Sequence, residues 1–193
     1  ILKKYRPDLK CPHENLNVHD INIAYCPERV IPGNTLQELI SNDRIVGGIT
    51  EECSNKALEF YQQFINGTCH KTDAETAELS KLAENSFRDV NIAFANELSM
   101  VCDENNVNVW RLIEIANKHP RVNILEPGPG VGGHCIAVDP WFIVANSDKA
   151  KLIKQSREVN LGKTKYVFEK ITKEIDHLVS TKDINAKDIS VAF

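Results

Sequence analysis

One short segment carries most of the residues that could do chemistry. Residues 128–140 read GPGVGGHCIAVDP, which places Cys135 behind a run of glycines and Asp139 four positions further on. Glycine adopts backbone conformations closed to other residues and lets a ligand's polar groups approach the main-chain amides. The glycines of this segment are Gly128, Gly130, Gly132 and Gly133. The pattern predicts a loop that presents a cysteine nucleophile, although a cysteine after two glycines is more often structural.

Three other side chains are candidates for the same site. Lys81 and Asn85 are spaced i,i+4, so on a helix both emerge from one face and could hold one ligand together. Glu28 follows a predicted strand, at the edge of the sheet where open α/β folds place their ligands. The ordinary alternatives are a solvated helix face for the first two residues and an ion pair with a nearby arginine for Glu28.

The cysteines and histidines form no metal-binding pattern. The chain has six cysteines without a CxxC pair, which favours reduced thiols over a disulfide framework or a zinc ribbon. A site built from His119, His134, Cys135 and Asp139 fits none of the standard ligand spacings, so no metal is predicted.

Length and charge narrow the class of protein. At 193 residues the chain can bury a real core in one large domain or two small ones. A net charge of -4 and a pI near 5.9 argue against a nucleic acid or an anionic membrane as partner. The sequence has no apolar run as long as a membrane span and no secretory signal order at its start, so we expect a cytoplasmic protein.

The first third of the chain alternates strand and helix patterns. Residues 20–26 and 44–50 are rich in β-branched residues and predict two strands. Thr50 then predicts the N-cap of a helix, and a brief strand follows at 69–71. Residues 1–71 are therefore predicted to form an incomplete α/β domain with at least three strands.

Helices dominate the rest of the chain. The pattern predicts helices over about 73–105, 107–118 and 149–179, with a short helix that begins at the DPWF sequence. Apolar residues at three- and four-residue steps predict one buried stripe on the first of these helices: Leu79, Leu82, Val90, Ala93, Phe94, Leu98 and Val101. Residues 72–185 thus predict a helical domain. Residues 186–193 are predicted to be the stub of a third domain, which opens with a strand at KDISVAF.

The order of three motifs resembles one enzyme family. The segments YCPERVIPG, TAELSKLAENSFRDVNIAFANE and HPRVNILEPGPGVGGHCIAVDPWF are similar, in that order, to the central portion of the UDP-glucose and GDP-mannose dehydrogenases. The resemblance runs from about Asp20 to the last residue. Because His134 precedes the cysteine and Val138 precedes the aspartate, the closest branch is the bacterial one that oxidises UDP-N-acetyl-D-mannosamine for surface polysaccharide. UDP-N-acetyl-D-glucosamine 6-dehydrogenase is the alternative.

The resemblance implies that the C6 alcohol of a UDP-sugar is oxidised to a carboxylate, with two NAD molecules used per turnover. Cys135 would attack the intermediate aldehyde, and the thiohemiacetal would be oxidised to a thioester that water hydrolyses. Lys81 would stabilise oxyanion character, with Asn85 as its hydrogen-bonding partner. Asp139 would help to organise water and the lysine.

The resemblance also implies the surroundings of this chemistry. Glu28 would activate water or position the substrate, but the second glutamate of the UDP-glucose enzymes is replaced here by Pro32, so the identity of the base stays open. Arg121 resembles an arginine that reaches the substrate from the dimer partner. The loop that binds the sugar would comprise Gly128, Gly130, Gly132, Gly133 and His134.

The fold implied by the resemblance is the C-terminal part of a Rossmann-like domain followed by a central helical dimerisation domain with long helices. We therefore expect a homodimer. The GxGxxG turn that binds the dinucleotide pyrophosphate in such enzymes is absent from the sequence, so its cofactor-binding residues stay unknown. We expect a fragment that is inactive by itself, and a natural non-catalytic dimerisation module is the alternative.

Overall fold

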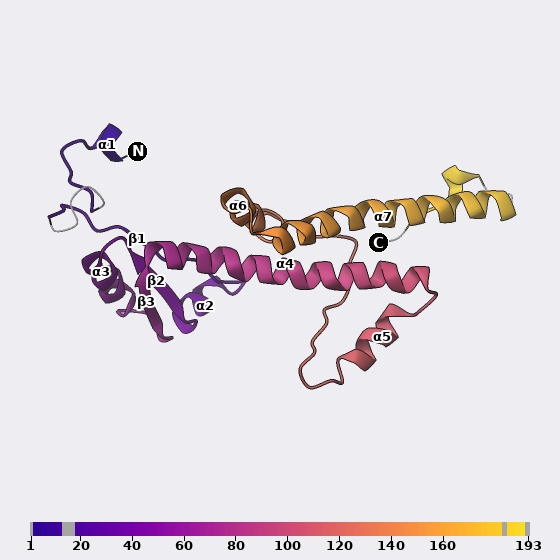
Figure 1. The fold of residues 1–193 in the computed structure, drawn as a ribbon, viewed down its shortest axis with the longest axis horizontal. Helices are drawn as coiled ribbons and strands as arrows, with labels where there is room; N and C mark the ends of the chain where they lie inside the picture. The colour runs from indigo at the N-terminus through magenta and orange to yellow at the C-terminus, as the bar shows by residue number, and fades with distance from the viewer. Residues whose placement is uncertain (1, 13–17, 183–184, 192–193) are drawn as a thin grey trace. The chain divides into compact units, whose positions relative to one another are not determined.

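The computed structural model describes residues 2–12, 18–182 and 185–191, and contacts divide the chain into two compact units, 1–83 and 84–193 (Figure 1). The expected fold class, an α/β part followed by long helices, is confirmed. The domain boundaries expected from the sequence, after residues 71 and 185, stay predictions.

The first unit contains a three-stranded sheet in the order β1-β2-β3. β2 (Arg44–Gly48) lies in the middle, antiparallel to β1 (Ala24–Tyr25) and parallel to β3 (Cys69–Asp73). The parallel strands are joined through α3 (Glu51–Tyr61), so β2, α3 and β3 form the expected βαβ unit. Most of β2 is buried, and Val46 is fully enclosed.

Two parts of the first unit differ from the sequence prediction. β1 has two residues, whereas a strand was expected over 20–26. The helices α1 (Leu2–Tyr5) and α2 (Thr35–Ser41) are not predicted by the sequence. α2 buries none of its residues and exposes Leu36, so it lacks the apolar face by which a helix is recognised, and the side chain of Asn34 makes no cap hydrogen bond.

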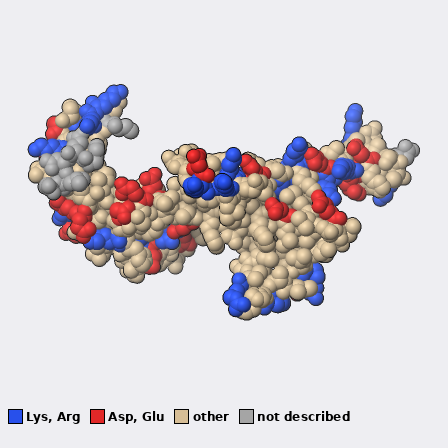
Figure 2. Space-filling model, viewed as in Figure 1, with Lys and Arg blue, Asp and Glu red and all other residues tan. Residues whose placement is uncertain are grey.

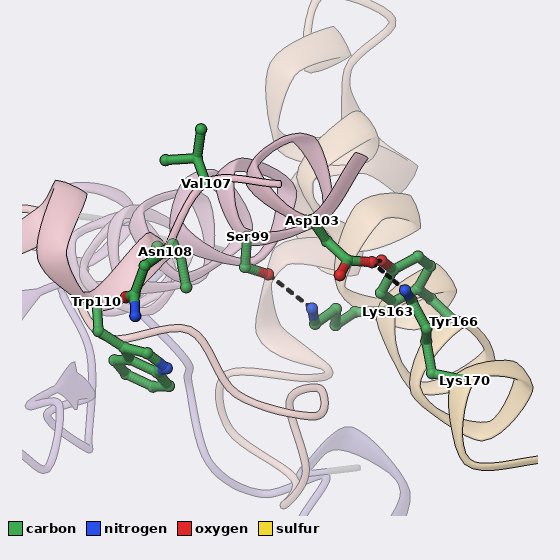
Figure 3. A pocket seen from close by; sticks show the side chains of 9 residues that line it. Ser99, Asp103, Val107, Asn108, Trp110, Lys163, Tyr166 and Lys170 are labelled. Atoms are coloured by element: carbon green, nitrogen blue, oxygen red, sulfur yellow. Dashed lines mark hydrogen bonds and ion pairs between the residues drawn. The ribbon is translucent and has the colours of Figure 1, made fainter. Parts of the chain in front are cut away.

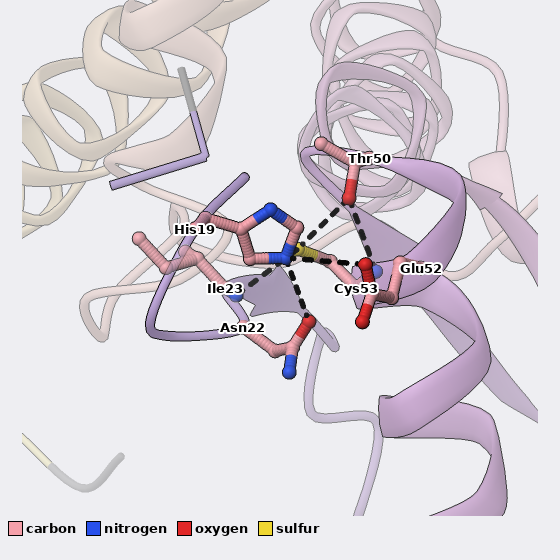
Figure 4. Close-up of polar contacts among 6 residues, drawn as sticks. All are labelled: His19, Asn22, Ile23, Thr50, Glu52 and Cys53. Atoms are coloured by element: carbon pink, nitrogen blue, oxygen red, sulfur yellow. Dashed lines mark hydrogen bonds and ion pairs between the residues drawn. The ribbon is translucent and has the colours of Figure 1, made fainter. Parts of the chain in front are cut away.

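A buried cysteine joins the start of α3 to the chain before β1 (Figure 4). As expected, Thr50 is the N-cap, and its hydroxyl oxygen accepts a hydrogen bond from the Cys53 N–H at 3.2 Å. Cys53 Sγ accepts from the Ile23 N–H at 3.4 Å and from the Thr50 hydroxyl at 3.1 Å. It also lies 4.0 Å from His19 Nε2. These contacts hold residues 19–23 against the first turn of α3.

Four α-helices build most of the described part of the second unit. α4 (Ala74–Glu104) begins in the first unit and ends in the second, and it is followed by α5 (Val109–Ala116), α6 (Asp139–Asn146) and α7 (Lys151–Lys182). Each corresponds to a helix expected from the sequence. α7 lies along one side of α4, and α5 lies on the other side (Figure 1).

The prediction of a strand over 187–193 is wrong for residues 187–191, which the structure describes. Ala186–Asp188 form a short 3-10 helix, η1, in which Asn185 Oδ1 accepts from the Lys187 N–H, and residues 189–191 are not in a strand. Residues 192 and 193 lie outside the described residues. A strand forms where another strand can satisfy its backbone groups, and η1 instead packs against α7.

The buried face of α4 is polar, which corrects the expected apolar stripe. Ala93 is buried, but Leu79, Phe94 and Val101 are 55%, 56% and 48% exposed. The buried side chains of α4 in the second unit are mainly small or polar: Asn85, Ser86, Asp89, Ala93, Ala95, Asn96 and Cys102. Those of α7 are all polar: Ser156, Arg157, Asn160 and Lys163. Polar groups can be buried here because the facing helix supplies their hydrogen-bond partners.

A buried ion pair connects the two long helices. Arg157 Nη1 donates to Asp89 Oδ1 at 2.6 Å, and the two side chains are 2% and 0% exposed. Removing one member of such a pair leaves an uncompensated buried charge and typically costs about 3–5 kcal/mol. The register of α4 against α7 is therefore strongly specified at this point.

A second polar contact between α4 and α7 borders a cavity of about 410 Å³ (Figure 3). Asp103 accepts hydrogen bonds from Lys170 Nζ and Tyr166 OH, and these contacts lower the pKa of the Asp103 carboxyl. Lys163 Nζ donates to Ser99 Oγ at 2.6 Å, while burial lowers the pKa of Lys163. Charged contacts thus join the helices at this end as well as in the core.

We expect Asp103 to make the stability of the chain fall in acid. Its folded-state pKa lies below the unfolded value, so its contribution is present above about pH 4 and is lost as the pH falls through the folded pKa. Urea unfolding of the wild type and Asp103→Asn should therefore differ most near neutral pH and converge toward about pH 2. A difference that stays constant over this range would contradict the prediction.

Candidate functional site

The glycine loop is fixed to the long helices at two points. The Gly128 N–H donates to Asn96 Oδ1 of α4 at 2.8 Å. Gly130 has a φ of +151°, and a Cβ at this position would lie 2.3 Å from Thr164 Oγ1 of α7. No side chain larger than hydrogen fits at Gly130 unless Thr164 moves, so the sequence requires glycine here for close approach.

The other two glycines of the loop border open space. A Cβ at Gly132 or Gly133 would meet nothing within 4 Å among the described residues. Gly133 has a φ of +77°, a left-handed conformation that glycine adopts without strain. His134 and Cys135 follow directly, and both are exposed. The middle of the loop is therefore accessible, while its beginning is held against α4 and α7.

A turn at the end of the loop joins the backbone of Cys135 to that of Asp139. The Cys135 carbonyl accepts from the Val138 N–H at 3.2 Å and from the Asp139 N–H at 2.9 Å. Asp139 is the first residue of α6, and Pro140 follows it. A carboxylate in the first turn interacts favourably with the helix dipole, and proline suits that turn because it needs no N–H donor there.

Asn85 and Asp139 are in direct contact, whereas the family resemblance implies Asn85 as the hydrogen-bonding partner of Lys81. Asn85 Nδ2 donates to Asp139 Oδ2 at 2.5 Å. Asn85 is 4% exposed, so it does not belong to a solvated helix face. Lys81 lies one turn earlier on α4 and is half-buried. The boundary between the two units falls between Lys81 and Asn85.

The remaining predicted residues lie apart from this contact in the sequence. Glu28, in the first unit, accepts from Arg44 Nη2 at 3.4 Å, which is the ion pair that the ordinary alternative anticipated. Its other oxygen accepts from the Arg29 N–H at 2.6 Å. Arg121, in the second unit, is exposed, and its N–H donates to His119 Nδ1 at 3.3 Å.

Four residues that support the loop were missed by the sequence reasoning: Asp89, Asn96, Arg157 and Asn160. All four are at most 1% exposed. A signal for them was present, since Asn85, Asp89 and Asn96 follow one another at steps of four and seven residues and thus share one face of α4. That face is polar, and polar residues at helical spacing usually indicate solvent rather than a core.

A second cavity, of about 340 Å³, lies in the first unit at the carboxyl ends of β2 and β3. Its lining includes Gly48, Thr50, Glu51 and Asp73. Open α/β folds bind dinucleotides at this place in the sheet. The lining also includes Lys71, which pairs with Glu51, so the cavity offers both donors and acceptors to a polar ligand.

Within the described part of the chain, no three side chains of histidine, cysteine, aspartate or glutamate are grouped so that they could hold a metal ion. No helix there combines the length and the apolar character needed to cross a membrane.

Two family domains match the chain in succession. Residues 4–65 match the NAD binding domain of the UDP-glucose/GDP-mannose dehydrogenase family, and residues 75–161 match the central domain of the same family. The Cys135 loop, Lys81, Asn85 and Asp139 all fall within the second match.

Named relatives are similar over most of the chain. The NDP-N-acetyl-D-galactosaminuronic acid dehydrogenase of Ralstonia nicotianae is 61% identical over 88% of this chain and 40% of its own length. The UDP-N-acetyl-D-mannosamine dehydrogenase of Campylobacter jejuni is 57% identical over 94% of this chain and 45% of its own. The structure of the UDP-N-acetyl-mannosamine dehydrogenase Cap5O from S. aureus matches 86% of this chain with a TM-score of 0.75 and 52% identity, and 40% of that chain is covered. The chain thus spans less than half the length of these relatives.

Proposed function

The chain belongs to the UDP-glucose/GDP-mannose dehydrogenase family, and we propose that the protein containing it is an NAD-dependent dehydrogenase that oxidises the C6 alcohol of a UDP-sugar to a carboxylate. The contact between Asn85 and Asp139, beside the loop that carries Cys135, is the structural observation that supports this proposal. It joins residues 54 positions apart, and the Asp139 N–H is bonded to the carbonyl of the exposed Cys135.

The exposed cysteine suits covalent capture of an aldehyde. Loss of a hydride and a proton converts the C6 alcohol to an aldehyde, and the Cys135 sulfur then adds to its carbonyl carbon to give a thiohemiacetal. Loss of a second hydride and proton gives a thioester. Water attacks the thioester carbonyl, the carbon–sulfur bond breaks, and the carboxylate and the free thiol are released. The aldehyde need not leave the protein between the two oxidations.

The other polar residues of the proposed site would stabilise the negative charge that develops on the substrate and orient a water molecule. Asn85 holds one oxygen of Asp139, which fixes the carboxylate in a direction where it can orient a water molecule. Lys81, one helical turn from Asn85, would stabilise the oxyanion that develops on the substrate oxygen. Glu28 is proposed to activate water or position the sugar, and its contact with Arg44 would hold its carboxylate in place.

NAD is the proposed cofactor, because residues 4–65 match the family's NAD binding domain. When bound, NAD accepts the hydride in each of the two oxidations. The cavity at the ends of β2 and β3 would hold part of it, with Thr50 and Asp73 as hydrogen-bonding groups. The chain's own residues would there orient the cofactor.

The proposed sugar is UDP-N-acetyl-D-mannosamine. Relatives named for this substrate are 54–57% identical over nearly the whole chain, and a solved structure of that name shares the fold. The relative from Ralstonia supports a second candidate, an N-acetyl-galactosamine sugar. Both sugars carry an acetamido group at C2, so the exposed Arg121 and His134 would contact features that the two substrates share.

A homodimer is proposed through the helices of the second unit. Phe87, Phe94 and Val101 recur at seven-residue steps on α4 and are 48–70% exposed, which is the spacing of a helix contact seam. A groove of about 240 Å³ between α4 and α7 is lined in part by Val90, Phe94 and Leu152. Figure 2 shows Lys and Arg side chains along the lower edge of the part formed by α5 and the segment after it, and surface without charged side chains above them. Exposed aromatic and aliphatic side chains that recur along one helix mark an interaction site.

We expect Cys135→Ser, made in the protein that contains the chain, to lower carboxylate formation by at least about 1000-fold, because a serine hydroxyl is a far weaker nucleophile at neutral pH. NADH formation from the UDP-sugar measures the effect. Cys69→Ser, at a half-buried cysteine of β3, is the matched control and should retain activity. Full turnover of Cys135→Ser would rule out the thioester route.

The substrate assignment is tested by comparing kcat/KM for the UDP-linked N-acetylated forms of mannosamine, glucosamine and galactosamine. We expect the mannosamine epimer to be preferred by about 10-fold or more, because a site that hydrogen-bonds sugar hydroxyls rejects a misplaced one. A preference for the galactosamine sugar would favour the second candidate. Turnover of none of the three would refute the proposed substrate class.

We expect Phe94→Glu to convert the dimer into a monomer, because the new charge would be buried without a partner in the contact seam. Light scattering of the chain measures the mass. Leu36→Glu, at a 78% exposed leucine of α2 in the first unit, should leave the mass unchanged. A wild-type chain that is monomeric at every concentration would remove the proposed interface.

A further inference from the structure

We propose that Asn96 and Asn160 are positioning residues that aim the glycine loop, and that the buried ion pair between Asp89 and Arg157 sets their orientation. This inference rests on the proposed function, in which the loop carries the reactive cysteine. Neither asparagine belongs to the motif around Cys135, and neither is among the residues that the family resemblance singles out.

The orientation begins at the ion pair. Arg157 donates to Asp89 Oδ1 at 2.6 Å, so this oxygen acts as an acceptor. Asn160 Nδ2 donates to the same oxygen at 2.8 Å and to the Asp89 carbonyl at 3.1 Å. A flipped Asn160 would place its own oxygen against both acceptors. Its amide therefore has one allowed orientation, with Oδ1 directed away from Asp89.

The second asparagine transmits this orientation to the loop. Asn96 Nδ2 donates to Asn160 Oδ1 at 2.9 Å, so the direction of the Asn96 amide is fixed in its turn. Asn96 Oδ1 is then the atom that accepts the Gly128 N–H at 2.8 Å. These hydrogen bonds form a series in which the orientation of each side-chain amide fixes that of the next. The series ends at Gly128, the first glycine of the loop.

The far end of the loop is held from the same face of α4. Asn85, eleven residues before Asn96, donates to Asp139 at 2.5 Å. Eleven residues are close to three helical turns, so Asn85 and Asn96 point in nearly the same direction. The segment from Gly128 to Asp139 is thus held at both ends by one rigid helix, and Cys135 lies between the two points.

Packing alone would not require these polar groups. Apolar side chains could hold α4 against α7 without removing an ion pair and two amides from water. The series of polar contacts also fixes an orientation, because it points Asn96 Oδ1 at the N–H of Gly128. It also commits the Gly128 N–H to the protein, so this amide is not available to a substrate.

Hydrogen exchange tests the anchor without any assay of activity. In the wild-type chain the Gly128 amide should exchange much more slowly than those of Gly132 and Gly133, which border open space. Asn96→Leu should raise the exchange rate of Gly128 by at least about 10-fold while the amides in the middle of α4 and α7 keep their protection. A Gly128 amide that already exchanges as fast as Gly132 in the wild type would overturn the proposal, whether or not the variant folds.

Asn160→Leu tests whether orientation is transmitted, since the amide of Asn160 reaches the Gly128 N–H through Asn96. It should raise Gly128 exchange in the same way. Asn91→Leu is the matched control, because Asn91 is a half-buried asparagine of α4 whose amide donates to the Phe87 carbonyl of its own helix. Unchanged Gly128 exchange in Asn160→Leu would overturn the transmitted orientation.

The consequence for catalysis is measured in the protein that contains the chain. For Asn96→Leu, kcat per folded molecule should fall by about 10- to 100-fold with a much smaller change in KM, because a misplaced nucleophile slows the reaction of bound substrate. Faster hydrogen exchange at Gly128 with an unchanged kcat would refute the positioning role, although Asn96 would still be shown to hold the Gly128 amide. Absence of dehydrogenase activity in the wild type would instead refute the proposed function, and the exchange result would stand independently.

Discussion

The ion pair between Asp89 and Arg157 is the contact on which the second unit depends. A carboxylate and a guanidinium with almost no exposure cannot each remain charged without the other, so α4 and α7 must meet at this register. Once they do, Asn160 and Asn96 have one satisfactory arrangement, and the first amide of the glycine loop has its acceptor. The position of the exposed glycine loop thus depends on the buried ion pair between Asp89 and Arg157, although neither residue belongs to the loop.

The four glycines of the loop have different structural roles, which the sequence alone does not distinguish. Gly130 is required by the approach of Thr164, and Gly133 by its left-handed backbone. Gly128 contributes an amide that the protein itself uses. Gly132 has room for a side chain, so its value lies in the access that it leaves to a ligand beside Cys135.

Local patterns predicted the elements of the fold well. The cap at Thr50 and the parallel pair β2 and β3 depend on residues close together in sequence, and the long helices carry clear periodicity. The buried polar face of α4 could not be found in this way, because Asn96 and Asn160 are 64 residues apart and each explains the burial of the other. The short α2 was missed for the opposite reason, since it buries almost nothing.

The candidate site was predicted from motif order and stays a prediction, although two of its residues, Asn85 and Asp139, are in contact. The spacing of two asparagines along α4 has a consequence for the loop. Asn85 and Asn96 both lie in the part of α4 that belongs to the second unit, and they hold Asp139 and the Gly128 amide. Because the backbone hydrogen bonds of the helix keep the distance between the two asparagines constant, the two ends of the loop can move apart only if α4 bends or one of these contacts breaks.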